Sequence, residues 1–218
     1  MTIDLQKLGG IAALIEAALY VTGFGLFLTV LDSSGYQGYV EKISFLAANQ
    51  VASFIAYLLI YVVFGLVLVV LALALHARLK NGSPAIMQTA TAFGLIWAGL
   101  VIASGMIANI GNSTVVRLFS ENQDQAVSLW LAIITVQEAL GGGNEIVGGL
   151  WVLLLSWAAM RGRSLPKMLN YLGVLVGLAG ILTVIPAYVV LTDVFGLGQI
   201  VWFAWLGIVM LRESPIAT

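Results

Sequence analysis

VASFIAYLLIYVVFGLVLVVLALALH, residues 51–76, is an unbroken apolar run. A helix needs about 20 consecutive apolar residues to cross the hydrocarbon core of a bilayer. Strands of a membrane barrel instead alternate apolar and polar residues over about ten positions. Because this run is longer and does not alternate, it predicts a membrane-spanning helix and excludes a barrel.

Comparable apolar runs recur along the whole chain. The composition is 61% hydrophobic and 9% charged, whereas a soluble domain carries about 25% charged residues. Lipid is therefore the expected solvent, and backbone groups in lipid must be paired within helices. The sequence predicts an all-α bundle that forms a single transmembrane domain over residues 1–218. Its six predicted spans lie at 8–31, 51–76, 85–110, 138–160, 168–191 and 194–211.

Two connecting segments are expected at the membrane surface, 32–50 and 112–137. The first is too polar to span, but its apolar residues recur at helical spacing, which favours an amphipathic helix. The second leads into an apolar run at 127–160 that is too long for one span. Gly141 lies inside that run, and the sequence leaves open whether the helix is continuous or broken there.

The positions of Lys and Arg predict the orientation, because basic loops remain in the cytoplasm. Basic residues occur near the N-terminus, after the second span, after the fourth span and after the sixth; they are Lys7, Arg78, Lys80, Arg161, Arg163, Lys167 and Arg212. These places fall on one side of a six-span bundle. Both chain ends are therefore expected in the cytoplasm, and the opposite side is net acidic.

Several classes of function find no support in the sequence. With no cysteine and one histidine, thiolate metal sites and bis-histidine haem within one chain are excluded. We expect no metal and no cofactor. A formal net charge of -1 gives no reason to expect nucleic acid as a partner. No catalytic motif occurs, so we do not expect an enzyme.

The sharpest polar pattern is QEALGGGNEIVGG at residues 137–149. Glu138 and Glu145 share one face if the helix is continuous, with Asn144 beside them. Carboxylates inside a membrane are costly and usually functional. One hypothesis is a carboxylate-lined cavity, open to the outer side, for a cation, a proton or a small polar ligand. The alternative is local capping and pairing of both glutamates near the interface.

Three further polar residues are candidates for ligand or ion binding. Glu16 lies about eight residues into the first span, Asp193 lies at the outer end of the last hairpin, and Asn109 lies near the end of the third span. A protonated, hydrogen-bonded Glu16 without a function is the competing interpretation. A further hypothesis unites the polar residues of the outer half in one vestibule, which only tertiary structure can bring together; they are Asn109, Asn112, Asn144, Glu145, Asp193 and Gln199.

Small residues mark the expected helix contacts. They form a stripe in the fourth span and a GxxxG pair in the fifth; the residues are Gly141, Gly142, Gly148, Gly149, Gly173 and Gly177. The leading functional hypothesis is a protein that binds or moves a small polar ligand, ion or proton. The alternative is a non-catalytic subunit whose glycine faces contact other chains, either a second copy or another membrane protein.

RGRSLPKMLNYLGVLVGLAGILTVIP at residues 161–186 combines a short basic loop, a proline and a glycine-rich span. This stretch and the span layout resemble a bacterial family of six-helix integral membrane proteins labelled domain of unknown function 4386. The resemblance implies a multi-pass protein of a bacterial plasma membrane. It assigns no activity, so no residue inherits a role from it.

Overall fold

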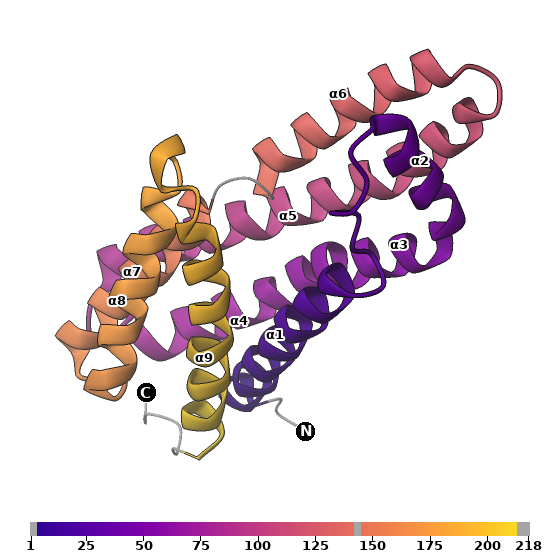
Figure 1. The fold of residues 1–218 in the computed structure, drawn as a ribbon. Coiled ribbons are helices and arrows are strands. Elements are labelled where there is room, and N and C mark those ends of the chain that lie inside the picture. The colour runs from indigo at the N-terminus through magenta and orange to yellow at the C-terminus, as the bar shows by residue number, and fades with distance from the viewer. Residues whose placement is uncertain (1–3, 142–144, 213–218) are drawn as a thin grey trace.

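The computed structural model describes residues 4–141 and 145–212, and every regular element in these two ranges is a helix (Figure 1). The predicted all-α class is therefore confirmed. In chain order the elements are α1 (Leu5–Leu28), α2 (Tyr39–Ala48), α3 (Gln50–Tyr57), the π-helical segment η1 (Leu58–Val63), α4 (Phe64–Leu79), α5 (Pro84–Phe119), α6 (Gln123–Gly141), α7 (Ile146–Gly162), α8 (Lys167–Leu182), the 3-10 turn η2 (Pro186–Tyr188) and α9 (Leu191–Arg212).

Local sequence accounts for several helix ends. The Asp4 carboxylate accepts hydrogen bonds from the backbone N–H groups of Gln6 and Lys7 and so caps the start of α1. Pro84 occupies the first turn of α5, where its missing N–H is tolerated. Arg163 ends α7 in the left-handed conformation, with φ 49°, the usual backbone state after a helix C-terminus.

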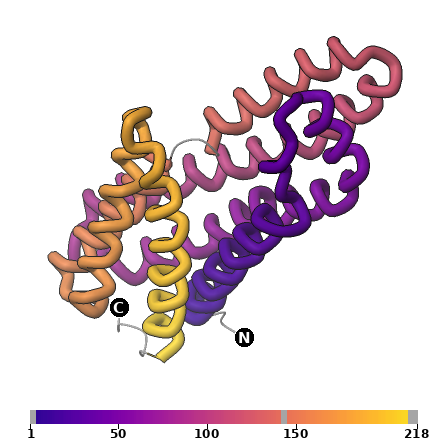
Figure 2. The backbone as a smooth tube through the Cα atoms, viewed as in Figure 1, coloured from indigo at the N-terminus to yellow at the C-terminus, as the bar shows by residue number. Residues whose placement is uncertain are grey.

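The long helix α5 organises the packing of the bundle. It has 36 residues, a length of about 54 Å at 1.5 Å per residue. α6 lies along the C-terminal half of α5, where Gly111 faces Ile133, and α7 lies along its N-terminal half, where Gly94 faces Trp151. α1 packs against both α4 and α9, and α8 packs against α7 and α9. Figure 2 shows this path, with α6 and α7 following one another beside α5.

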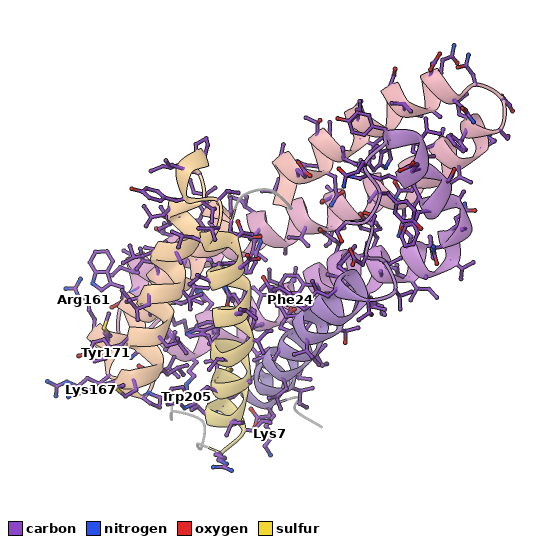
Figure 3. The ribbon with its side chains drawn as sticks, viewed as in Figure 1. Lys7, Phe24, Arg161, Lys167, Tyr171 and Trp205 are labelled. Carbon is purple, nitrogen blue, oxygen red and sulfur yellow. The ribbon has the colours of Figure 1, made fainter. Side chains whose placement is uncertain are left out.

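The basic segments gather at one end of the bundle. There the Gln6 side chain donates a hydrogen bond to the carbonyl of Met210, and the Arg78 guanidinium donates one to the carbonyl of Ser164. Lys7, Arg161 and Lys167 lie at this same end in Figure 3, whereas Phe24 lies further along the bundle. The opposite end holds α2 and the connection between α5 and α6 (Figure 1).

Five stretches are long and apolar enough to cross a membrane; they are Leu5–Leu28, Gln50–Leu79, Pro84–Phe119, Gln123–Gly162 and Leu191–Arg212. The fourth comprises α6 and α7 and includes residues 142–144, which lie outside the described part of the chain. The apolar helix α8 is shorter, with 16 residues, or about 24 Å at the helical rise. These stretches indicate a multi-pass membrane protein in a lipid bilayer.

Helix boundaries differ from the sequence prediction in four main places. The third predicted helix does not end at residue 110 but continues to Phe119, where α5 packs against α6. Residues 123–137, predicted as part of a surface segment, belong to α6. The fourth predicted span, 138–160, is divided between α6 and α7. The fifth, 168–191, stops at Leu182, four residues before Pro186, which cannot continue a helix.

The core is built around interlocking aromatic rings. Trp97 contacts Phe64 and Trp151, with ring centroids 5.5 and 5.7 Å apart, and Trp151 contacts Trp202 at 5.9 Å. Trp151 and Trp202 are fully buried. Such large side chains fix the distance between α4, α5, α7 and α9, so the space beside them is rigidly framed.

The glycines of α7 and α8 make contacts within the chain. A methyl group on Gly149 would lie 2.7 Å from the carbonyl oxygen of Gly177, and one on Gly177 would lie 2.8 Å from that of Gly149. Gly173 packs against Ser156 and Trp202, and Gly148 packs against Trp97. Gly141 meets only Val101, at an ordinary 3.6 Å. Close approach of α7 and α8 therefore requires Gly149 and Gly177.

Candidate functional site

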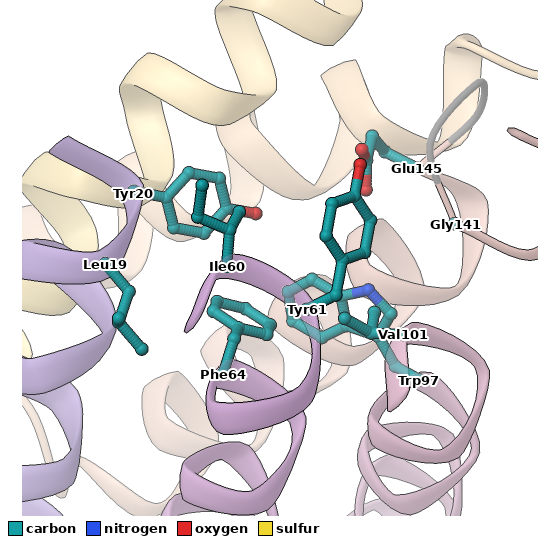
Figure 4. Close-up of a pocket in the computed structure, with 9 residues that line it drawn as sticks. All are labelled: Leu19, Tyr20, Ile60, Tyr61, Phe64, Trp97, Val101, Gly141 and Glu145. Atoms are coloured by element: carbon teal, nitrogen blue, oxygen red, sulfur yellow. The ribbon is translucent and has the colours of Figure 1, made fainter. Parts of the chain in front are cut away.

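A small cavity of about 110 Å³ lies beside the aromatic core (Figure 4). Residues from α1, η1, α4, α5, the end of α6 and the start of α7 line it; they are Leu19, Tyr20, Ile60, Tyr61, Phe64, Trp97, Val101, Gly141 and Glu145. Its walls are mostly aromatic or aliphatic. One carboxylate, two phenols and the Trp97 indole supply the polar groups, and Figure 4 shows the Tyr61 phenol pointing toward the Glu145 carboxylate.

A larger cavity of about 330 Å³ shares part of this lining. Both cavities are lined by Tyr20, Ile60, Tyr61 and Glu145. The large cavity extends toward the C-terminal part of α1 and the first turn of α9, where Asp193 joins the lining. Its volume is at the lower end of the range of about 300–1,000 Å³ found for small-molecule sites. We call the two together the Glu145 cavities.

Glu145 is held immediately before the first residue of α7. Its backbone N–H donates a 2.8 Å hydrogen bond to Thr183 Oγ1, and its carbonyl accepts from the N–H of Gly149 in the first turn of α7. Although Glu145 occupies the N-cap position, its side chain makes no capping hydrogen bond. The backbone of Glu145 is thus fixed from two sides, while its carboxylate is left to face the cavities.

The π-helical segment η1 brings two further residues to the site. A π-helix is rare and occurs often at functional sites, and here Ile60 and Tyr61 of η1 line both cavities. The Tyr61 hydroxyl accepts a 3.2 Å hydrogen bond from the Gln137 amide of α6. Two irregular backbone segments, η1 and the break before α7, therefore meet at the same cavities.

The electrostatics of the site are acidic. Among the described residues that line the Glu145 cavities, the charged ones are Glu145 and Asp193, and no Lys, Arg or His is present. Within residues 4–141 and 145–212, the Glu145 side chain has no ion-pair or hydrogen-bond partner. A half-buried carboxylate without a protein counter-ion favours a positively charged occupant.

Not all predicted site residues meet at the cavities. Glu145 and Asp193 share the lining of the large cavity. Glu138 is exposed on α6 and is absent from both linings. Residues 142–144 lie outside the described part of the chain, but the backbone of Glu145 is not helical (φ -114°, ψ 23°), so Glu145 does not continue a helical face from Glu138. Asn144 and Gly142 lie outside the described residues.

Glu16 and Asn109 are also separate from this site. Glu16 is fully buried in α1, and within the part of the chain that the structure describes neither carboxylate oxygen has a hydrogen-bond partner. Asn109 is half-buried on α5, and its side-chain oxygen lacks a partner among the same residues. Neither residue lines the Glu145 cavities, so the predicted vestibule that includes Asn109 does not form there.

A third cavity, of about 270 Å³, lies toward the opposite end from the basic segments. It contains Lys42 of α2 and the polar side chains of Ser53 and Asn112, and we call it the Lys42 cavity. Phe27 lines both this cavity and the large one. Phe27 is thus the lining residue common to the Lys42 cavity, which contains a basic group, and the acidic large cavity.

Sequence reasoning did not assign a site role to the aromatic residues of the cavities. Tyr20, Tyr61 and Trp97 come from three different helices, and each type is common in membrane proteins at any depth. One signal was present, since Tyr20 follows Glu16 by one helical turn. The structure shows that Tyr20, not Glu16, lines the cavities. Glu16 and Tyr20 lie one turn apart on the same face of α1. Their positions along the helix therefore separate them, and the place of the cavities along α1 depends on the neighbouring helices.

Fold and site together define a multi-pass helical membrane protein with an acidic, aromatic-walled cavity at the start of α7. The family model described as "Domain of unknown function (DUF4386)" matches residues 8–209, and the chain belongs to this family. This confirms the resemblance seen in the sequence. No curated protein and no solved structure matches the chain.

Proposed function

We propose that this protein is a six-span membrane protein that binds a small positively charged ligand at Glu145. The observation that carries the proposal is the Glu145 carboxylate, which faces two cavities and has no counter-ion among the described residues. Asp193 adds a second negative charge to the large cavity. A bound cation would supply the positive charge that the described lining of the cavities lacks.

The six-span layout accommodates the short helix α8. With α6 and α7 taken as one interrupted span along α5, the bundle has the five long stretches plus α8. A span of about 24 Å is tolerated where flanking residues reach the interface or the bilayer thins. Irregular backbone at membrane depth is tolerated where it is buried in protein or lines a cavity, which suits the break at Glu145.

The clustering of basic residues supports an outward-facing site. Lys7, Arg161 and Lys167 lie at one end (Figure 3), which the distribution of positive charge assigns to the cytoplasm. The helix ends that lie away from this basic end carry three residues of the large cavity: Phe24 near the end of α1, Glu145 before α7 and Asp193 in the first turn of α9. The Glu145 cavities then belong to the outer half of the protein.

The rival function, an accessory subunit with glycine faces for partner chains, loses its main support. Gly149, Gly173 and Gly177 are occupied by contacts between helices of the same chain. Those faces are therefore not free for a second protein. The exposed apolar side chains of the outer surface, such as Leu175 and Val201, need only lipid as their partner.

The test is cation-dependent stabilisation of the purified protein in detergent. Chloride salts of sodium, potassium and tetramethylammonium are compared at constant ionic strength, and the melting temperature is measured. At least one cation is expected to raise it, and Glu145→Gln is expected to weaken this binding by about tenfold or more, because a charge-assisted contact is lost. Glu138→Gln, a carboxylate outside the cavities, is the matched control. Equal binding by wild type and Glu145→Gln would refute the proposal.

A further inference from the structure

The walls around Glu145 are largely aromatic. Tyr20, Tyr61, Phe64 and Trp97 line the small cavity, and Phe24 and Phe27 continue the aromatic surface into the large one. The rings are fixed by one another, with centroids 5.4 Å apart for Tyr20 and Phe64 and 5.5 Å apart for Phe64 and Trp97. A cation placed over such a ring within about 6 Å is attracted by the negative face of its π-system.

The arrangement is poor for a metal ion. Hard cations such as Ca²⁺ require six to eight oxygen ligands, and Mg²⁺ requires near-octahedral geometry. Within the described residues, no group of three or more His, Cys, Asp or Glu side chains is placed to hold a metal. The small cavity supplies one carboxylate and two phenols. A cation that needs no oxygen shell fits this lining better than one that does.

An organic ammonium ion suits both the aromatic walls and the small number of oxygen ligands. Its alkyl groups spread the charge over an apolar surface, so the ion is weakly hydrated and can contact aromatic faces and a single carboxylate at once. The small cavity, about 110 Å³, exceeds the roughly 10–15 Å³ that one water needs. The adjoining large cavity provides room for a substituent on the same nitrogen.

We propose that the cation bound at Glu145 is a small alkylated ammonium, with its charged head among Tyr20, Tyr61 and Trp97 and its substituent in the large cavity. This inference rests on the proposed function, because it names the class of ligand for the same site. It assigns the negative charge to Glu145 and the selectivity for alkylated over inorganic cations to the aromatic walls.

The experiment compares two isosteres, choline and the neutral 3,3-dimethyl-1-butanol, with sodium chloride at matched ionic strength. Binding to the purified full chain is measured by thermal stabilisation and calorimetry. Choline is expected to bind, and the neutral isostere and sodium are expected to bind at least tenfold more weakly.

A matched pair of variants tests the aromatic contribution. Tyr20→Phe keeps the ring and is expected to retain choline binding, whereas Tyr20→Leu removes it and is expected to weaken binding about 3- to 30-fold. Phe45→Leu, in the Lys42 cavity, controls for nonspecific loss. The melting temperatures without ligand show whether each variant is folded.

The outcomes separate the two proposals. Stabilisation by sodium that depends on Glu145, without any effect of choline, would overturn the ammonium inference and leave the proposed function standing. Equal binding of choline and its neutral isostere, or equal binding to Tyr20→Phe and Tyr20→Leu, would also overturn the inference. No stabilisation by choline, sodium, potassium or tetramethylammonium would overturn both.

Discussion

The backbone amide of Glu145 is bound by the side chain of Thr183, at 2.8 Å from nitrogen to Oγ1. The same hydroxyl donates a 2.7 Å hydrogen bond to the carbonyl of Gly180 in the last turn of α8. Thr183 is buried, with 4% of its surface exposed. One hydroxyl therefore ties the start of α7 to the end of α8, and it fixes the position of the carboxylate at the cavities.

Thr183→Val is expected to destabilise the protein and weaken cation binding. It keeps the shape of the side chain but leaves the Glu145 N–H without its partner, at a cost of about 1–3 kcal/mol. Thr183→Ser retains the hydroxyl and is the control. The measurements are the melting temperature and the cation affinity. A Val variant that matches wild type in both would show that this hydrogen bond does not position Glu145.

Glu16→Met is expected to raise the melting temperature. Glu16 is fully buried and its carboxylate has no hydrogen-bond partner in the described part of the chain. Replacing an unsatisfied buried polar group by an apolar one of similar size is expected to gain about 1–3 kcal/mol. Cation binding should be unchanged, because Glu16 does not line the Glu145 cavities. Loss of binding at unchanged stability would instead assign Glu16 a role in function.

Gly149→Ala is expected to lower stability by about 1–3 kcal/mol, the range for overpacking of a tight contact. The added methyl would lie 2.7 Å from backbone atoms of both Gly177 and Ile181, so α7 and α8 must separate. The control is Gly99→Ala, where a methyl meets nothing within 4 Å. Thermal unfolding in detergent compares the two. Similar melting temperatures for both variants would contradict the close α7–α8 approach.

The proposed orientation is tested by single cysteines, since the chain contains none of its own. Glu121→Cys is expected to react with a membrane-impermeant maleimide on intact cells. Lys80→Cys is expected to react only after the membrane is permeabilised. Both side chains are exposed. Lys80 lies just before the start of α5, and Glu121 lies just after its end. The reverse labelling pattern would place the basic end outside.

The helical class could be predicted from the length of the apolar runs alone. In lipid every backbone group must be paired locally, so an apolar run such as 51–76 has no alternative to a helix. The irregularity of the fourth span was also visible in its glycines and its excess length. Glu145 and Asp193 were recognised as candidates because a carboxylate in an apolar run is costly wherever the run packs.

The apolar runs did not predict where each helix ends or which of its faces points into the bundle. The extension of α5 to Phe119 depends on contacts with α6, because an isolated pattern of this composition also fits a surface segment. The sequence could not show that Glu138 is exposed while Glu145 faces a cavity. That outcome depends on the backbone of Glu145, which is not helical just before α7 begins (φ -114°, ψ 23°).

The sequence by itself determined that the chain is a helical membrane protein, where its charges gather and which carboxylates are candidates. Composition and run length suffice for these conclusions, because the bilayer imposes the same requirement on every residue within it. Tertiary structure alone decided that Glu145 shares cavities with Tyr20, Tyr61 and Asp193, while Glu16 and Glu138 do not. The physical reason is that a cavity is formed by several helices whose rotation and separation are fixed by packing contacts far apart in the chain.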